Sequence, residues 1–247
     1  MSSRDTHANS GSGRLGTVLS GLAVALGCLL FLGGFVWGAI VYRPYTVPTD
    51  SMQPTVNPGD RVLAQRIKGD EVRRGDVVVF NDPQWGNEPI VKRVVGVGGD
   101  KIACCDKQGR LTVNGAPIGE PYLLQQGQAP IPATTVPRGQ LFMLGDNRQV
   151  SMDSRVHLAD GDHGAVPSSE VAARVDATVW PLGQLKEVTR PGSFAALPGG
   201  VSQPGPITWI ASAVTAGVVL ILGGAAYGPI AGRRRKRAER RRVLARA

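Results

Sequence analysis

Two long stretches without a charged residue constrain this chain more than any other feature. The first covers residues 15–42 and the second covers 207–230. At a rise of about 1.5 Å per residue, a helix of either length crosses a hydrocarbon core of about 30 Å. The alternative for the first stretch is a cleaved secretory signal, but the apolar region of such a signal, about 7–15 residues, is shorter than this stretch. A buried core helix is the alternative for the second, but core helices do not usually end in a run of cations like the one beginning at Arg233.

The net charge of +9 is concentrated in the C-terminal tail, where residues 233–247 carry nine cations and one acidic residue. Between the two tails, cations and acidic residues are equal in number, so no basic face for reading nucleic acid is expected. Cations flanking a span mark its cytoplasmic side, which predicts two cytoplasmic termini and an outward-facing middle. Binding of nucleic acid or anionic lipid is the alternative role for the tail.

These observations predict six segments along the chain, beginning and ending with a cytoplasmic tail. The segments are an N-terminal tail at 1–14, a transmembrane anchor at 15–42, an extracytoplasmic domain at 43–190, a linker at 191–206, a second transmembrane helix at 207–230 and a basic tail at 231–247.

The middle of the chain has the texture of an antiparallel β domain. Its short apolar runs, rich in Val, Ile and Leu and separated by Gly, Pro, Asn and Asp, are DRVLAQR, GDVVVFND, PIVKRVVGV, DKIACC, RLTVNGAPI, QLFMLGD and RVDATVW. Asn114-Gly115 is a strong signal for a tight hairpin turn. No convincing amphipathic helix is found between 43 and 206. We therefore predict a mainly β, barrel-like or sandwich domain.

Several kinds of site chemistry find little support. Cys104 and Cys105 are adjacent and could form a vicinal disulfide, but two thiols without other soft ligands do not make a zinc site. His157 and His163 lie in a loop-like stretch and read as solvated histidines rather than as members of a Ser-His-Asp triad. The sequence has no HExxH, GxGxxG or P-loop motif, so we expect no metal or organic cofactor.

A serine and a lysine remain as candidates. Ser51 lies in PYTVPTDSMQPTVNPGD, where repeated prolines fix the backbone and could hold a hydroxyl in a set direction; a proline-rich stalk is the alternative. Lys92 shares one face of the strand PIVKRVVGV with Ile90 and Val94. If that face is buried, desolvation lowers the pKa of Lys92 and its neutral amine can act as a general base for a serine. An exposed strand face is the alternative. The later run GDNRQVSMDSR, taken alone, is an ordinary polar loop.

Together these clusters resemble the bacterial type I signal peptidases. The matching pieces, in order, are SMQPT at 51–55, GDVVVF at 75–80, VKRVVGVGGD at 91–100 and GDNRQVSMDSR at 145–155. The resemblance covers roughly residues 36–182. The second span and basic tail are similar to the two-anchor forms of some Gram-positive, actinobacterial-like lineages. The implied fold is a catalytic domain of coiled antiparallel sheets flanked by two transmembrane helices.

The resemblance also implies an activity and a set of roles. The activity is a membrane-bound serine endopeptidase that removes signal peptides from exported preproteins, cutting after small A-x-A-like residues. Ser51 would be the nucleophile and Lys92 its general base, with Ser151 orienting the lysine amine. The oxyanion would be held by the Ser51 N–H and the Thr49 hydroxyl. The remaining implied roles are an ion pair of Asp153 with Arg155, scaffold positions at Asp146 and Arg148, and an apolar pocket lined by Tyr45, Val47, Met52 and Val91.

The implied partners are preprotein signal peptides and the lipid bilayer, with the export machinery as a further candidate and no nucleic acid. The implied location is the cell membrane, with the catalytic domain on its outer side. Gln149-Val150 and Met152 depart from the family pattern at positions without a catalytic role. A self-cleaving repressor protease shares the dyad but has a cytosolic domain. A non-enzymatic tethered module is the other alternative, and it would tolerate alanine at Ser51 and Lys92.

Overall fold

The computed structural model describes residues 11–86, 88–127 and 129–244. The predicted tail at 1–14 lies mostly outside the described residues, as does the end of the basic tail at 245–247. The chain divides into two compact units: a helical unit made from its two ends, and a β unit spanning Val41–Gly205.

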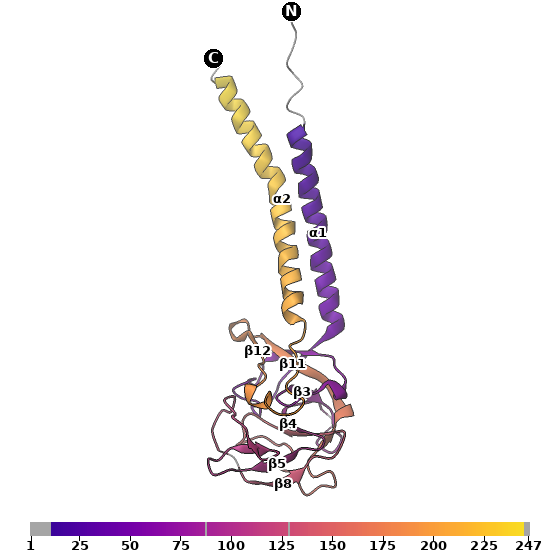
Figure 1. Ribbon diagram of the computed structural model, residues 1–247. Helices are drawn as coiled ribbons and strands as arrows, with labels where there is room; N and C mark the ends of the chain where they lie inside the picture. Colours follow the sequence, from indigo (N-terminus) through magenta and orange to yellow (C-terminus); the bar gives the residue numbers. More distant parts are fainter. Residues whose placement is uncertain (1–10, 87, 128, 245–247) are drawn as a thin grey trace, which may run out of the picture. The chain divides into compact units, whose positions relative to one another are not determined.

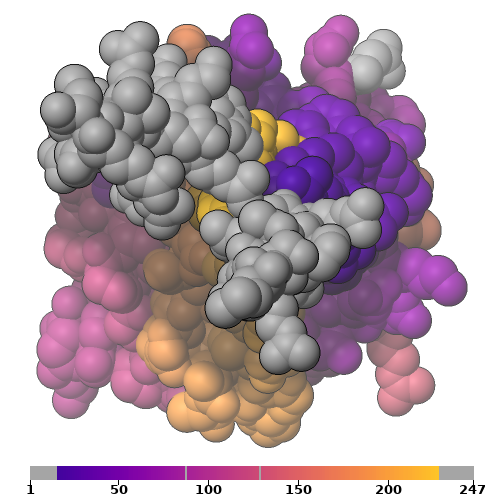
Figure 2. All heavy atoms as spheres, turned by 90° about the horizontal axis from the view of Figure 1, so that it is seen from above, coloured from indigo at the N-terminus to yellow at the C-terminus, as the bar shows by residue number. Residues whose placement is uncertain are grey.

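The helical unit consists of α1 (Gly11–Val41) and α2 (Ile207–Leu244), which lie side by side (Figures 1 and 2). Gly16–Val41 and Ile207–Tyr227 are each long and apolar enough to cross a membrane, which confirms the two predicted apolar helices. Glycines allow the helix backbones to approach closely, because a Cβ added at Gly27 would lie 2.8 Å from the Gly217 carbonyl oxygen. Ser20 Oγ also donates a hydrogen bond of 2.7 Å to the carbonyl of α2 residue Gly224.

The β unit is built on an eight-stranded antiparallel sheet with the order β1-β2-β11-β3-β4-β9-β10, in which β12 pairs with β11. The strands are β1 (Tyr42–Thr46), β2 (Arg61–Gln65), β3 (Val77–Phe80), β4 (Ile90–Val97), β9 (Gln140–Leu144), β10 (Val166–Pro167), β11 (Val171–Trp180) and β12 (Lys186–Glu187). The sheet curls into a half-barrel, helped by irregular register within β4 and β11.

A smaller antiparallel sheet follows the order β7-β6-β5-β8. Its strands are β5 (Lys101–Cys104), β6 (Leu111–Val113), β7 (Ala116–Pro117) and β8 (Ile131–Thr135). The predicted hairpin turn joins β6 to β7, with positive φ at both Asn114 and Gly115. Cys104 and Cys105 are joined by a disulfide. The prediction of a mainly antiparallel β domain is confirmed.

All seven predicted apolar runs contain strands, whereas β1, β8, β10 and β12 were missed. β1 and β8 each contain a proline, at Pro44 and Pro132, and each lies at the edge of its sheet. Proline is tolerated at such edges because it removes only a donor that needs no partner strand. Among the described residues from 43 to 206, the helical elements are short 3-10 turns. They are η1 (Gly69–Glu71), η2 (Ser168–Glu170), η3 (Leu182–Gln184) and η4 (Gly192–Phe194).

The linker was predicted at 191–206, but residues 191–205 belong to the β unit and pack on it. Phe194 is fully buried in the core cluster that also contains Leu197. The carbonyl of Pro198 accepts a hydrogen bond of 2.7 Å from Arg74 Nη1. A composition rich in Gly, Pro and Ser suggested a free tether, but these apolar and polar contacts with the domain hold the segment in place. We refer to residues 191–205 as the strap.

Candidate active site

Ser51 lies in the loop that joins the edge strand β1 to β2. The loop folds back on itself, because Val47 N donates to the Asp60 carbonyl at 3.0 Å and Gly59 N donates to the Val47 carbonyl at 2.8 Å. The Ser51 side chain is only 6% exposed, and its Oγ lies 3.2 Å from the Thr49 hydroxyl. The proline-rich segment is therefore a packed part of the domain and not a stalk.

Lys92 lies near the centre of β4 and points toward that loop. Its Nζ is 2.9 Å from Ser51 Oγ and 3.2 Å from the Val91 carbonyl oxygen. The residue is 4% exposed, and burial lowers the pKa of Lys92 from 10.5 to about 8, against the opposing effect of Asp153 and Asp146. The alternative of an exposed strand face is wrong, because Arg93, on the opposite face, is also buried.

The loop after β9 supplies the remaining polar groups. Asp153 and Arg155 form a two-point ion pair, with Nε–Oδ1 and Nη2–Oδ2 distances of 2.7 and 2.8 Å. Asp153 Oδ2 also accepts a hydrogen bond of 3.0 Å from Gly145 N. The pair therefore fixes both ends of the Gly145–Ser151 turn, whose Asn147 N donates to the Ser51 carbonyl at 3.0 Å.

The expected hydrogen bond between Ser151 and Lys92 is absent from the structure. Ser151 Oγ is buried and has no hydrogen-bond partner among the described residues. Its side chain instead packs against the backbone of Gly145, where an added Cβ would overlap both the Ser151 hydroxyl and the Ser51 carbonyl oxygen. Leaving a buried hydroxyl unpaired costs about 1–3 kcal/mol.

The four residues expected to line a substrate pocket come together in one apolar cluster. Val47, Met52 and Val91 are buried members of it, and Tyr45 is half-buried at its edge. In this structure the first three therefore lie beneath the surface, and the Tyr45 side chain is the most accessible of the four.

A second charged pair, not predicted from the sequence, is formed by Arg93, the residue after Lys92, and Asp146. Arg93 binds both carboxylate oxygens of Asp146, at 2.8 and 2.7 Å, and Asp146 also accepts from the Thr55 hydroxyl. Arg93 and Asp146 are almost fully buried. An arginine beside Lys92 in a run of valines was the available signal, but alternation assigned it to the opposite face without identifying a partner.

Metal ligands and a catalytic histidine were also considered in the rest of the described chain. No group of three His, Cys, Asp or Glu side chains within the described ranges could bind a metal ion. His157 pairs with Asp160 at 2.8 Å and stacks on the Trp85 ring.

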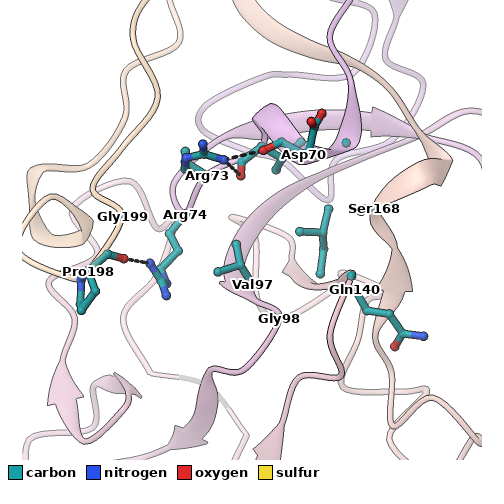
Figure 3. Close-up of a pocket in the computed structure, with 13 residues that line it drawn as sticks. Asp70, Arg73, Arg74, Val97, Gly98, Gln140, Ser168, Pro198 and Gly199 are labelled. Carbon is teal, nitrogen blue, oxygen red and sulfur yellow. Dashed lines mark hydrogen bonds between the residues drawn. The ribbon is translucent and has the colours of Figure 1, made fainter.

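A surface cavity of about 460 Å³ lies beside Arg73 and Arg74, and Figure 3 shows the residues that line it. Arg74 is held there by the Pro198 carbonyl and, through the rest of its guanidinium, by Asp100. None of the predicted site residues lines this cavity, so the serine and lysine lie elsewhere on the domain.

In this antiparallel β domain a serine hydroxyl lies beside a buried lysine amine, and the chain also has two helices that could cross a membrane. This combination matches the class of membrane-associated serine peptidases. The family model described as "Signal peptidase, peptidase S26" matches residues 19–180, and the chain belongs to this family. The resemblance to type I signal peptidases is thereby confirmed.

Two bacterial signal peptidases that are similar in sequence agree with this assignment. The chain is 33% identical over 177 residues to Signal peptidase IB of Staphylococcus aureus (strain Mu50), covering 64% of this chain and 87% of the relative. It is 31% identical over 210 residues to a probable signal peptidase I of Mycobacterium leprae, covering 60% of this chain and 71% of the relative. A crystal structure of a signal peptidase I from Enterococcus faecalis is 27% identical with a TM-score of 0.35, covering 41% of this chain and 94% of that one.

Proposed function

We propose that this family member removes signal peptides from exported preproteins with Ser51 as the nucleophile and Lys92 as the general base. The observation that carries the proposal is the distance of 2.9 Å between Lys92 Nζ and Ser51 Oγ in a buried setting. A lysine with a pKa of about 8 is neutral in a useful fraction of molecules near neutral pH.

The chemistry follows the usual two stages of acyl transfer. Ser51 Oγ attacks the scissile carbonyl carbon while its proton passes to the neutral Lys92 amine, which then protonates the leaving amine as the C–N bond breaks. Water, deprotonated by the same lysine, next attacks the acyl-serine ester, and the ester C–O bond breaks to release the signal peptide and regenerate the Ser51 hydroxyl. The proton count is restored at the end of the cycle.

The negative oxygen formed in each stage needs fixed donors. We assign this role to the Ser51 N–H and the Thr49 hydroxyl, which lies 3.2 Å from Ser51 Oγ. Removing one such donor typically lowers the rate by about 10²–10³-fold. The unpaired hydroxyl of Ser151 is the candidate to hold the Lys92 amine once Ser51 Oγ has turned to the substrate.

Substrate specificity is assigned to the apolar cluster beside the serine. An extended signal-peptide segment would pair with exposed backbone leading into the site, with its small side chains facing Tyr45, Val47, Met52 and Val91. Because Val47, Met52 and Val91 are buried, we infer that this cluster admits only small side chains, as cutting after an A-x-A-like sequence requires.

The two apolar helices and the basic run after the second one support a multi-pass protein of the cell membrane. We propose that both termini are cytoplasmic and that the β unit faces outward, where exported preproteins emerge. The export machinery is a candidate neighbour of such a peptidase.

The test is cleavage of a preprotein with an A-x-A signal by the full chain in detergent, beside Ser51→Ala and Lys92→Ala. The proposal expects the wild type to cut after the small residue and both variants to be inactive while retaining the wild-type circular dichroism spectrum. Cleavage at wild-type rate by either variant would refute the assignment of the dyad. A wild type that binds preproteins without cutting them would instead favour a non-enzymatic tethered module.

A further inference from the structure

A buried acidic group lies close to the active site without a role in the proposed chemistry. Glu120 is 8% exposed and lies in the segment that follows β7 of the smaller sheet, whereas Lys92 lies in the larger sheet. Its carboxylate pairs with Arg148 through Nη2–Oε1 and Nη1–Oε2 distances of 2.5 and 3.3 Å. Burying two charges costs desolvation free energy that only well-aligned hydrogen bonds offset, and this pair is aligned at two points.

Arg148 is itself part of the Gly145–Ser151 turn, whose Asn147 N–H donates to the Ser51 carbonyl. Its Nε donates to the Gly145 carbonyl at 2.9 Å, and its own carbonyl accepts from Arg155 Nη2 at 2.9 Å. Gly145 packs directly between the Ser151 side chain and the Ser51 carbonyl. A shift of the Arg148 guanidinium would therefore move the backbone on which Ser51 and Ser151 rest.

Tyr122 reinforces the same arrangement. Its hydroxyl donates to Glu120 Oε1 at 2.7 Å, and its ring centroid lies 4.1 Å from the guanidinium carbon of Arg93. Burial of the hydroxyl and the negative charge of Glu120 raise the pKa of Tyr122 well above its ordinary value, so the phenol remains a donor. Leu124 N adds a hydrogen bond of 3.3 Å to the Asp146 carbonyl. The segment 120–124 thus contacts three charged residues next to the site: Arg148, Arg93 and Asp146.

We propose that Glu120 and Tyr122 are positioning residues, which hold the Gly145–Ser151 turn in register with Ser51 and Lys92 through Arg148. The inference rests on the proposed function. It assigns the smaller sheet a part in turnover, because its packing fixes where Glu120 stands: Ile118 N donates to the Leu111 carbonyl of β6 at 2.8 Å, and Ile118 is buried in the core.

The test compares Glu120→Ala, Glu120→Gln and Tyr122→Phe with the wild type in detergent, using a signal-peptide substrate. The matched control is Asp100→Asn, which weakens a buried ion pair of similar length, with Arg74, that makes no contact with Ser51, Lys92 or the turn. Misplacement of a reacting group by about 1 Å can lower kcat about 100-fold. We expect Glu120→Ala to lower kcat about 10- to 100-fold and KM less than about 2-fold.

The conservative variants separate positioning from stability. Glu120→Gln keeps an acceptor for Arg148 and should recover several-fold of the lost kcat, Tyr122→Phe should lose only a few-fold, and Asp100→Asn should lower the melting temperature with kcat unchanged. Wild-type kcat in folded Glu120→Ala, or an equal kcat loss in Asp100→Asn, would overturn the inference.

A readout without activity distinguishes this inference from the proposed function. Hydrogen exchange of a peptide covering 145–151 reports on the Asn147 N–H that donates to Ser51. Exchange there should accelerate in Glu120→Ala and not in Asp100→Asn; equal protection in both variants would overturn the positioning role. An inactive wild type would refute the proposed function, while the exchange result would still decide the placement of the turn.

Discussion

Replacing Lys92 by methionine should abolish turnover and, at neutral pH, stabilise the fold. Methionine has a similar length and no charge, and it keeps most of the volume of the lysine stem, which is 4% exposed. The same burial that gives the amine its proposed role opposes its protonated form, so the native state binds a proton there less readily than the unfolded chain does.

The size of the effect follows from the pKa of Lys92. Lowering it from 10.5 to about 8 corresponds to about 3 kcal/mol of stability that is absent at pH 7. Because the folded pKa is the lower one, this stability returns as the pH rises from 8 through 10.5. Losing the hydrogen bond to Ser51 costs about 1 kcal/mol, so Lys92→Met should be about 2 kcal/mol more stable at pH 7.

Urea unfolding of the full chain in detergent, followed by circular dichroism at pH 7 and pH 10, measures the difference. The advantage of Lys92→Met should shrink by about 2–3 kcal/mol between these pH values. Lys101→Met, at an exposed position of β5, is the control and should change stability by less than about 0.5 kcal/mol at both. An advantage that does not depend on pH would refute the argument that burial depresses the pKa of Lys92.

Three further predictions concern activity and stability. Cleavage at low substrate concentration should rise about tenfold per pH unit below pH 8 and level off above it, because Lys92 must be neutral; a rate already constant at pH 6 would contradict this. Gly145→Ala should lower kcat by about 100-fold, since the new methyl overlaps Ser151, whereas Gly161→Ala, with open space around it, should not; initial rates compare them. Phe194→Ala should cost about 3–5 kcal/mol in urea unfolding, and a loss below about 1 kcal/mol would mean that the strap is not part of the core.

Periodicity and composition predicted the larger elements well because those elements are set by local patterns. Seven apolar runs became strands and two charge-free stretches became helices. The edge strand β1 was hidden because its residues fell partly in the first apolar span and partly in the proline-rich run. Pro44 does no harm there because an edge position leaves its missing N–H without consequence.

The site was predictable to the extent that its parts carry their own signal. Lys92 stood out as a charge in a valine strand, and the ordered motifs supplied Ser51 and the ion pair of Asp153 with Arg155. The identity of the partner that Arg93 needs could not be read from alternation, because both faces of β4 are covered and a buried arginine is satisfied only by a residue distant in sequence. No local sequence pattern marked Glu120, because its role depends on an ion pair with Arg148, a residue distant in the sequence.

The path of the strap has a topological consequence. Gly205, the last residue of the β unit, lies against the Tyr42 hydroxyl and the Asp176 carboxylate, so the chain leaves the domain beside the point where it enters. Tyr42 and Asp176 are themselves joined by a hydrogen bond of 2.9 Å. The two ends of the β unit thus lie close together, and each end continues into a helix. One nick in either connection would leave the β unit tethered through the other, and shedding it would require two independent cuts.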